Sequence, residues 1–139
     1  MKKIFDLISE DLSKVVTEKY STSFSIATKL IDNSIRQDIY NIYGFVRIAD
    51  EIVDSFHQYP KKEILDKLEK DVYIAINQKI SINPILNSFQ KTVNILKISL
   101  FVGLSSSKFF LSSFDICLTV FYYYFKQDPR LTKILDRTL

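Results

Sequence analysis

Two aspartates one helical turn apart, Asp50 and Asp54, are the side chains in this sequence best suited to metal chemistry. Residues spaced three and four apart lie on one face of an α-helix, so Tyr43, Arg47 and the two aspartates form a single stripe. Mg²⁺ prefers hard oxygen ligands and is commonly held by one or two carboxylates together with substrate phosphates. Asp50 and Asp54 are therefore a candidate Mg²⁺ site acting on a phosphate ester.

Arg47 lies one turn before Asp50 on the same stripe, and its planar guanidinium is suited to paired contacts with phosphate oxygens. The same residues would also form a structural ion network inside a helical bundle. Spacing alone fits both interpretations equally well, because acidic residues four apart often occur by chance in helices.

The helix that carries this stripe is expected from about Ser34 to Phe56. Asp32 to Ser34 supply a capping signal, and apolar residues then recur at helical spacing without interruption. Because apolar residues flank Asp50 and Asp54 on both sides, we expect the helix to be buried together with its acids. Buried carboxylates repel each other and resist desolvation, so they require protons, basic partners or bound cations.

Other helices are expected before about residue 94. The first is amphipathic, with apolar residues at three- and four-residue steps from Ile4 to Val16. It ends at a bend in Tyr20 to Ser23, where hydroxyl side chains cap or interrupt helices. Further helices begin near Pro60 and at Asn83 and Pro84. Two glycines and three prolines in 139 residues are few breaks, which favours helices throughout.

The composition changes near residue 95 and becomes strongly apolar and aromatic. Between residues 98 and 125 the charged residues are Lys108 and Asp115, and strict alternation from Phe114 to Val120 predicts a strand. A membrane span is the weaker interpretation, because the two charges and a run of serines interrupt any stretch of about 20 apolar residues.

The composition excludes several classes of function. Nineteen basic and 16 acidic residues are interspersed along the chain and give a net charge of +3, which is too balanced for a nucleic-acid groove.

The single cysteine, Cys117, cannot form an internal disulfide and is expected to be inert. The single histidine, His57, is expected in an exposed loop or a cap. Early acidic residues do not fit a signal peptide, so we expect a cytoplasmic location.

Several features together resemble the squalene/phytoene synthase family. They are YSTSF at Tyr20 to Phe24, IRQDIYNIYGFVRIADEIVD at Ile35 to Asp54, and the gap between them. The family carries an S-x-S/T-F segment and a helix reading roughly Y-x-x-x-R-x-x-D-D/E-x-x-D. The resemblance extends from about the first helix to Val93. It implies an all-α, isoprenoid-synthase-like helical bundle, here incomplete, over residues 1–94, followed by an atypical tail over residues 95–139.

The resemblance also implies roles for the residues of the stripe. Asp50 and Asp54 would form the first aspartate-rich motif and hold Mg²⁺ on the diphosphate of a prenyl substrate. Glu51 stands where a second aspartate is often found and would support them. Arg47 would bind the diphosphate, and Tyr43 would line the substrate cleft.

Ser21 and Phe24 would belong to a flap over the leaving group, although a helix cap and a core aromatic explain them equally well. Family members join two prenyl diphosphates head to head. The first expectation is conversion of geranylgeranyl diphosphate to phytoene in carotenoid biosynthesis, and the next is a squalene-type product from farnesyl diphosphate. Because such substrates and products are greasy, peripheral membrane contact is also expected.

The chain departs from the family in one respect. A second aspartate-rich helix is missing, since Asp115, Asp128 and Asp136 are isolated. We therefore expect little or no synthase activity from the 139-residue chain, and our hypothesis for residues 95–139 is a truncated or frameshifted continuation. The alternative function is a noncatalytic helical module that pairs with a partner, or with itself, through the apolar tail.

Overall fold

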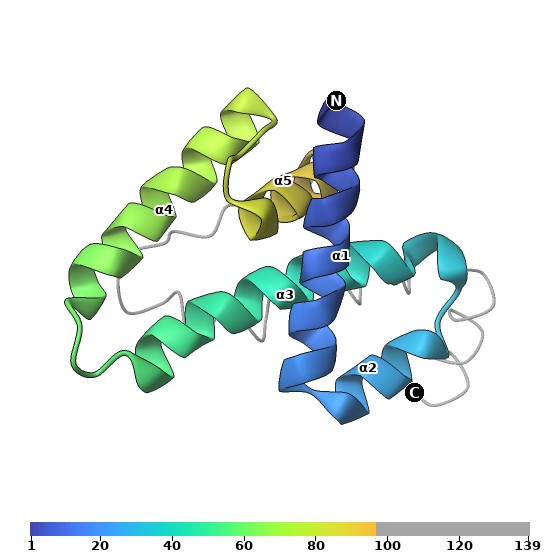
Figure 1. The fold of residues 1–139 in the computed structure, drawn as a ribbon, viewed down its shortest axis with the longest axis horizontal. Coiled ribbons are helices and arrows are strands. Elements are labelled where there is room, and N and C mark those ends of the chain that lie inside the picture. The colour runs from blue at the N-terminus through green and yellow to red at the C-terminus, as the bar shows by residue number, and fades with distance from the viewer. Residues whose placement is uncertain (97–139) are drawn as a thin grey trace, which may run out of the picture.

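The computed structural model describes residues 1–96, which form five helices and no strand within that range (Figure 1). This part of the chain confirms the expected all-α architecture. The helices begin close to where the capping and proline signals predicted, and they are α1 (Lys2–Tyr20), α2 (Thr22–Lys29), α3 (Asn33–Ser55), α4 (Lys61–Gln78) and α5 (Pro84–Leu96).

Some expectations fall outside residues 1–96. These are the strand at Phe114 to Val120, the inert Cys117, and the structure of nearly all of the apolar tail. Within the described range, none of the helices combines the length and the apolar character needed to cross a bilayer.

Polar side chains cap α2 and α3 at their first turns. Ser21 is extended, with φ −147°, and its hydroxyl accepts a hydrogen bond from the backbone N–H of Phe24 at 3.2 Å. Asp32 accepts one from the N–H of Ser34 at 2.9 Å. Such bonds satisfy N–H groups that have no partner within the first helical turn. Both the bend at Tyr20 to Ser23 and the start of the acid-bearing helix are confirmed.

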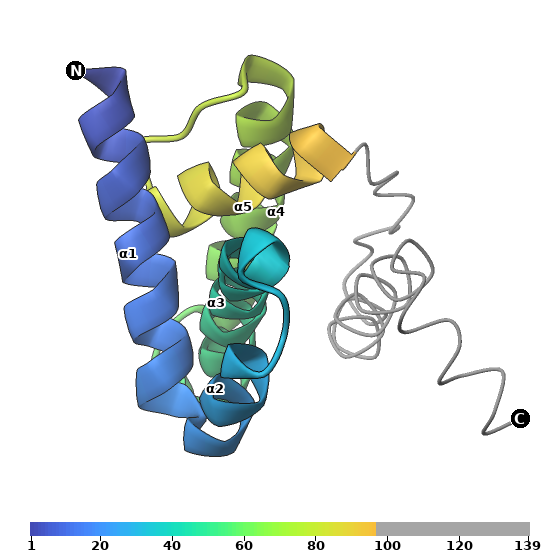
Figure 2. The ribbon, with the colours of Figure 1, turned by 90° about the vertical axis from the view of Figure 1, so that its right-hand side faces the viewer.

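α5 lies at the centre of the described helices and contacts α1, α3 and α4 (Figures 1 and 2). Its apolar face contributes Leu86, Phe89 and Val93 to the core, where the Phe89 ring stacks on Phe45 of α3 with centroids 4.1 Å apart. The remaining buried members of this cluster come from α3 and α4: Ile42, Val46 and Val72.

The face through which α1 packs differs from the sequence expectation. Its buried residues are Ser9, Ser13 and Thr17, each fully buried, rather than the apolar stripe. Small polar side chains are buried on this face because they permit close approach to α3. They also hydrogen-bond to α5, as the hydroxyls of Ser13 and Ser88 do at 2.5 Å. The apolar residues that we expected to pack are exposed instead: Ile4, Leu7, Ile8, Leu12 and Val15.

Further polar contacts join α1 to α5 across the same interface. Lys91 pairs with Glu10 at 2.6 Å, and the side-chain amide of Asn87 donates to Asp6 at 2.9 Å and to Ser9 at 3.1 Å. Because these buried or half-buried groups find partners, the polar interface avoids the cost of desolvating them alone.

Gly44 of α3 sits where α1 crosses, and even a single added carbon atom would be tightly packed there. A Cβ atom at this position would lie 3.1 Å from the carbonyl oxygen of Ser13 and 3.2 Å from its Cα, both rigid backbone atoms. We expect Gly44→Val to force α1 and α3 apart and to lower the free energy of unfolding by about 1–3 kcal/mol. Chemical denaturation followed by circular dichroism measures this.

The control for this substitution is Ala27→Val, which introduces the same β-branched side chain at an exposed position of α2. It is expected to change the free energy of unfolding by less than Gly44→Val. Equal stability of the Gly44→Val variant and the unmodified chain would contradict the close helix crossing.

Candidate functional site

The predicted stripe lies along the second half of α3, from Tyr43 to Asp54, but its acids are less buried than the sequence suggested. The side chain of Asp50 is 28% exposed and that of Asp54 is 64% exposed. The expectation that both acids are buried with the helix is therefore wrong for Asp54. The reason is positional, because the core clusters around the middle of α3 whereas Asp54 is one residue from its end.

Arg47 lies among three carboxylates. Its Nη2 atom donates a hydrogen bond to Glu51 at 3.2 Å, while Nη1 lies 4.0 Å from Asp50 and 3.9 Å from Asp54. The two longer distances are charge contacts rather than hydrogen bonds. The guanidinium thus uses one edge to hold Glu51 and turns the other toward the two aspartates.

An aromatic ring from α1 covers this guanidinium. The Cζ atom of Arg47 lies 4.7 Å from the ring centroid of Tyr20, the last residue of α1, which is a cation–π distance. Burial, the negative charge of Glu51 and a hydrogen bond to Glu51 raise the pKa of Tyr20 above the ordinary value of a phenol. Each of these effects favours the neutral hydroxyl, so Tyr20 keeps its proton at neutral pH.

The predicted flap residues meet the stripe through a second aromatic contact. The Phe24 ring stacks on Tyr43 with centroids 4.1 Å apart and planes 16° from parallel. Ser21 caps the helix that carries Phe24, so the cap and the ring stack together fix α2 beside α3. The fold therefore gathers Ser21, Phe24 and Tyr43 on the same side as Arg47.

The donor set of the stripe fits Mg²⁺. Within residues 1–96 there is no group of three or more His, Cys, Asp or Glu side chains placed to hold a metal ion. Two carboxylates completed by phosphate oxygens and waters are nevertheless an ordinary Mg²⁺ environment. The positively charged guanidinium of Arg47 lies within 4.0 Å of both aspartates, so the two carboxylates already face a cationic group.

Sequence reasoning missed Tyr20. It begins the YSTSF segment, yet no spacing rule relates the end of α1 to the middle of α3, so its place over Arg47 is a tertiary feature. His57 lies in the connection from α3 to α4 and is exposed, as expected, and its Nδ1 atom is 2.8 Å from the Nζ atom of Lys61, the first residue of α4.

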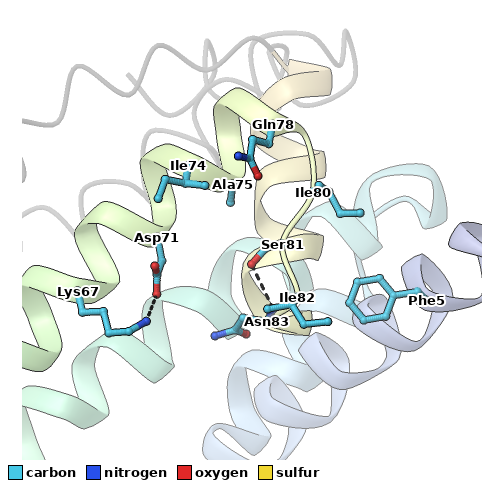
Figure 3. A pocket seen from close by; sticks show the side chains of 10 residues that line it. All are labelled: Phe5, Lys67, Asp71, Ile74, Ala75, Gln78, Ile80, Ser81, Ile82 and Asn83. Carbon is cyan, nitrogen blue, oxygen red and sulfur yellow. Dashed lines mark hydrogen bonds and ion pairs between the residues drawn. The ribbon is translucent and has the colours of Figure 1, made fainter.

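A pocket of about 620 Å³ lies elsewhere on the described helices (Figure 3). It opens between the start of α1, the end of α4 and the connection to α5, and Phe5, Ile74 and Ile82 line it beside the ion pair of Lys67 and Asp71. Its lining contains none of the predicted site residues. The acid stripe of α3 and this pocket are separate features.

A comparison of the sequence with known protein families supports the helical fold described above. The model of the squalene/phytoene synthase family matches residues 17–101, which is more than half of the chain and includes the bend, the whole of α3 and α5. No curated protein and no solved structure matches. The all-α isoprenoid-synthase fold of that family agrees with the helices described above. On the extent of this match, the chain belongs to the squalene/phytoene synthase family.

Proposed function

We propose that Asp50 and Asp54 hold Mg²⁺ against the diphosphate of a prenyl substrate, with Arg47 binding diphosphate oxygens beside them. The family as a whole carries out head-to-head condensation of prenyl diphosphates, so the general reaction class follows from membership. The assignment of individual residues and of the metal is our proposal.

One observation carries the proposal: three carboxylates converge on a single cation. Asp50, Glu51 and Asp54 all lie within 4.0 Å of the guanidinium of Arg47. Three negative charges and one positive charge leave a local formal charge of −2, which a divalent cation neutralises.

The chain's own residues have distinct tasks in this proposal. The carboxylates of Asp50 and Asp54 supply the hard oxygen ligands, and Arg47 pairs with the phosphate oxygens through its planar fork. When bound, Mg²⁺ supplies Lewis-acid neutralisation of the departing diphosphate. The stacked rings of Phe24 and Tyr43 are apolar neighbours that help to keep water from an allylic cation.

For the substrate we propose geranylgeranyl diphosphate, converted to phytoene in carotenoid biosynthesis. A squalene-type condensation of farnesyl diphosphate is the alternative within the same chemistry. We also propose that the 139-residue chain alone does not complete either reaction, because the one acid stripe among the described helices supplies too few ligands for the full set of Mg²⁺ ions. A cytoplasmic location with peripheral membrane contact suits these greasy substrates.

Hydrogen–deuterium exchange on the purified chain tests the diphosphate site without requiring turnover. We expect inorganic pyrophosphate together with Mg²⁺ to slow amide exchange in the last turns of α3, where Asp50 and Asp54 lie. In parallel, incubation with geranylgeranyl or farnesyl diphosphate and Mg²⁺ should yield no condensed product. Unchanged exchange in α3 would contradict the proposed site, and appreciable product would contradict the proposed inactivity.

A noncatalytic interaction module is the second candidate function, and the exposed apolar face of α1 favours it. Ile4, Leu7 and Ile8 are each about half exposed or more on one side of this helix. Contiguous apolar surface of this kind often marks a protein contact. Dimerisation that is indifferent to Mg²⁺ and pyrophosphate, without ligand protection of α3, would favour this function over the enzymatic one.

A further inference from the structure

The contacts of Arg47 fall into two kinds that come from two different helices. Glu51, one turn further along α3, accepts the hydrogen bond from its Nη2 atom at 3.2 Å. Tyr20, at the end of α1, presents its ring to the guanidinium at 4.7 Å. A guanidinium is planar, so a hydrogen bond at its edge and a ring contact on its face together define its orientation.

Tyr20 and Glu51 also interact with each other. The carboxylate of Glu51 is near enough to raise the pKa of the Tyr20 phenol, so the ring, the guanidinium and the carboxylate form a compact triangle. Two of its members come from α3 and one from α1, and α1 and α3 pack closely at Gly44. The triangle is therefore anchored to the helix crossing rather than to a single flexible side chain.

Held in this way, Arg47 turns its other edge toward the aspartates. Nη1 lies 4.0 Å from Asp50 and 3.9 Å from Asp54, the two carboxylates that would hold Mg²⁺ in the proposed function. A free arginine side chain loses considerable rotamer entropy when a ligand immobilises it. Immobilising the side chain before the ligand arrives removes part of that cost from binding.

We infer that Tyr20 is a positioning residue, whose ring acts with Glu51 to hold the guanidinium of Arg47 facing the diphosphate. This inference rests on the proposed function, because it takes the diphosphate as the ligand of Arg47. Tyr20 itself does not touch the reacting atoms. Tyr20 contributes to the orientation of Arg47 through the cation–π contact of its ring with the guanidinium.

Three variants of the full 139-residue chain test the inference. Tyr20→Leu removes both the ring and the hydroxyl, and Tyr20→Phe keeps the ring and removes the hydroxyl. Tyr73→Leu is the matched control, because Tyr73 on α4 is 44% exposed and Tyr20 is 43% exposed. Circular dichroism establishes that each variant retains its helices.

Two measurements are made on each variant. The first is the NMR shift of the Arg47 side-chain protons without any ligand, because a ring face moves nearby protons upfield. The second is calorimetric titration with inorganic pyrophosphate in the presence of Mg²⁺. For Tyr20→Leu we expect the upfield shift to vanish and the dissociation constant to rise roughly two- to fivefold, the range of an exposed cation–π contact.

Tyr20→Phe is expected to keep the upfield shift, and Tyr73→Leu to change neither quantity. An unchanged Arg47 shift in Tyr20→Leu, or pyrophosphate binding as tight as in the unmodified chain, overturns the inference. If the unmodified chain does not bind pyrophosphate with Mg²⁺, the proposed function fails. The ligand-free shift still decides whether Tyr20 orients Arg47, so the two failures are distinguishable.

Discussion

Replacing Asp50 with Asn should weaken Mg²⁺-dependent pyrophosphate binding on the order of a hundredfold, because a carboxylate ligand contributes several kcal/mol to charge neutralisation at such a site. Asparagine keeps the size of the side chain and removes its charge. Together with Arg47 and Glu51, the altered site would carry one less negative charge toward the cation. Calorimetric titration with pyrophosphate, with and without Mg²⁺, measures the loss.

The control is Asp66→Asn on α4. Asp66 is also a half-exposed helical acid, paired with Lys62 at 3.6 Å, and it lies outside the acid stripe. Its replacement is expected to leave pyrophosphate binding unchanged. Equal losses in the two variants would mean that general charge, rather than the placement of Asp50, attracts the ligand, and the metal assignment would then be wrong.

Replacing Phe89 with Ala should cost about 3–5 kcal/mol of unfolding free energy, the largest stability effect that we expect among the described residues. The ring is 2% exposed, stacks on Phe45 at 4.1 Å and belongs to the cluster shared by α3, α4 and α5. Removing it leaves a cavity that helices anchored on three sides cannot close. Denaturant titration followed by circular dichroism gives the difference.

Tyr73→Ala is the matched control for this truncation, since it removes an aromatic ring that is 44% exposed on α4. Its effect should stay far below that of Phe89→Ala. Small and similar losses for both variants would contradict the packing described for α5.

The features that sequence alone predicted well are local. Helix α3, its cap at Asp32 and the bend after Tyr20 depend on neighbouring residues, and the structure contains all three. The stripe of Arg47 and Asp50 likewise follows from helical geometry alone. Spacing can therefore identify which side chains share a face before any tertiary structure is known.

The features that sequence missed are tertiary. The apolar stripe of α1 suggested its buried face, but Ser13 and Thr17 are buried instead, because close packing and hydrogen bonds to α5 decided the contact. Apolar flanks suggested that Asp54 is buried, but it lies next to the end of α3, beyond the core. No pattern within one helix could have revealed that Tyr20 meets Arg47.

The hydrogen bonds between α1 and α5 have a consequence for the order of folding. Ser13 and Ser88 are 75 positions apart in the chain, and Glu10 and Lys91 are 81 apart. During synthesis the first helix therefore emerges long before α5, one of its two principal partners, exists, and closing so long a loop slows its docking on α5. Until α5 has been made, the hydroxyl of Ser13 lacks its partner Ser88 and must hydrogen-bond water, so the polar interface of α1 is completed only by the last of the described helices.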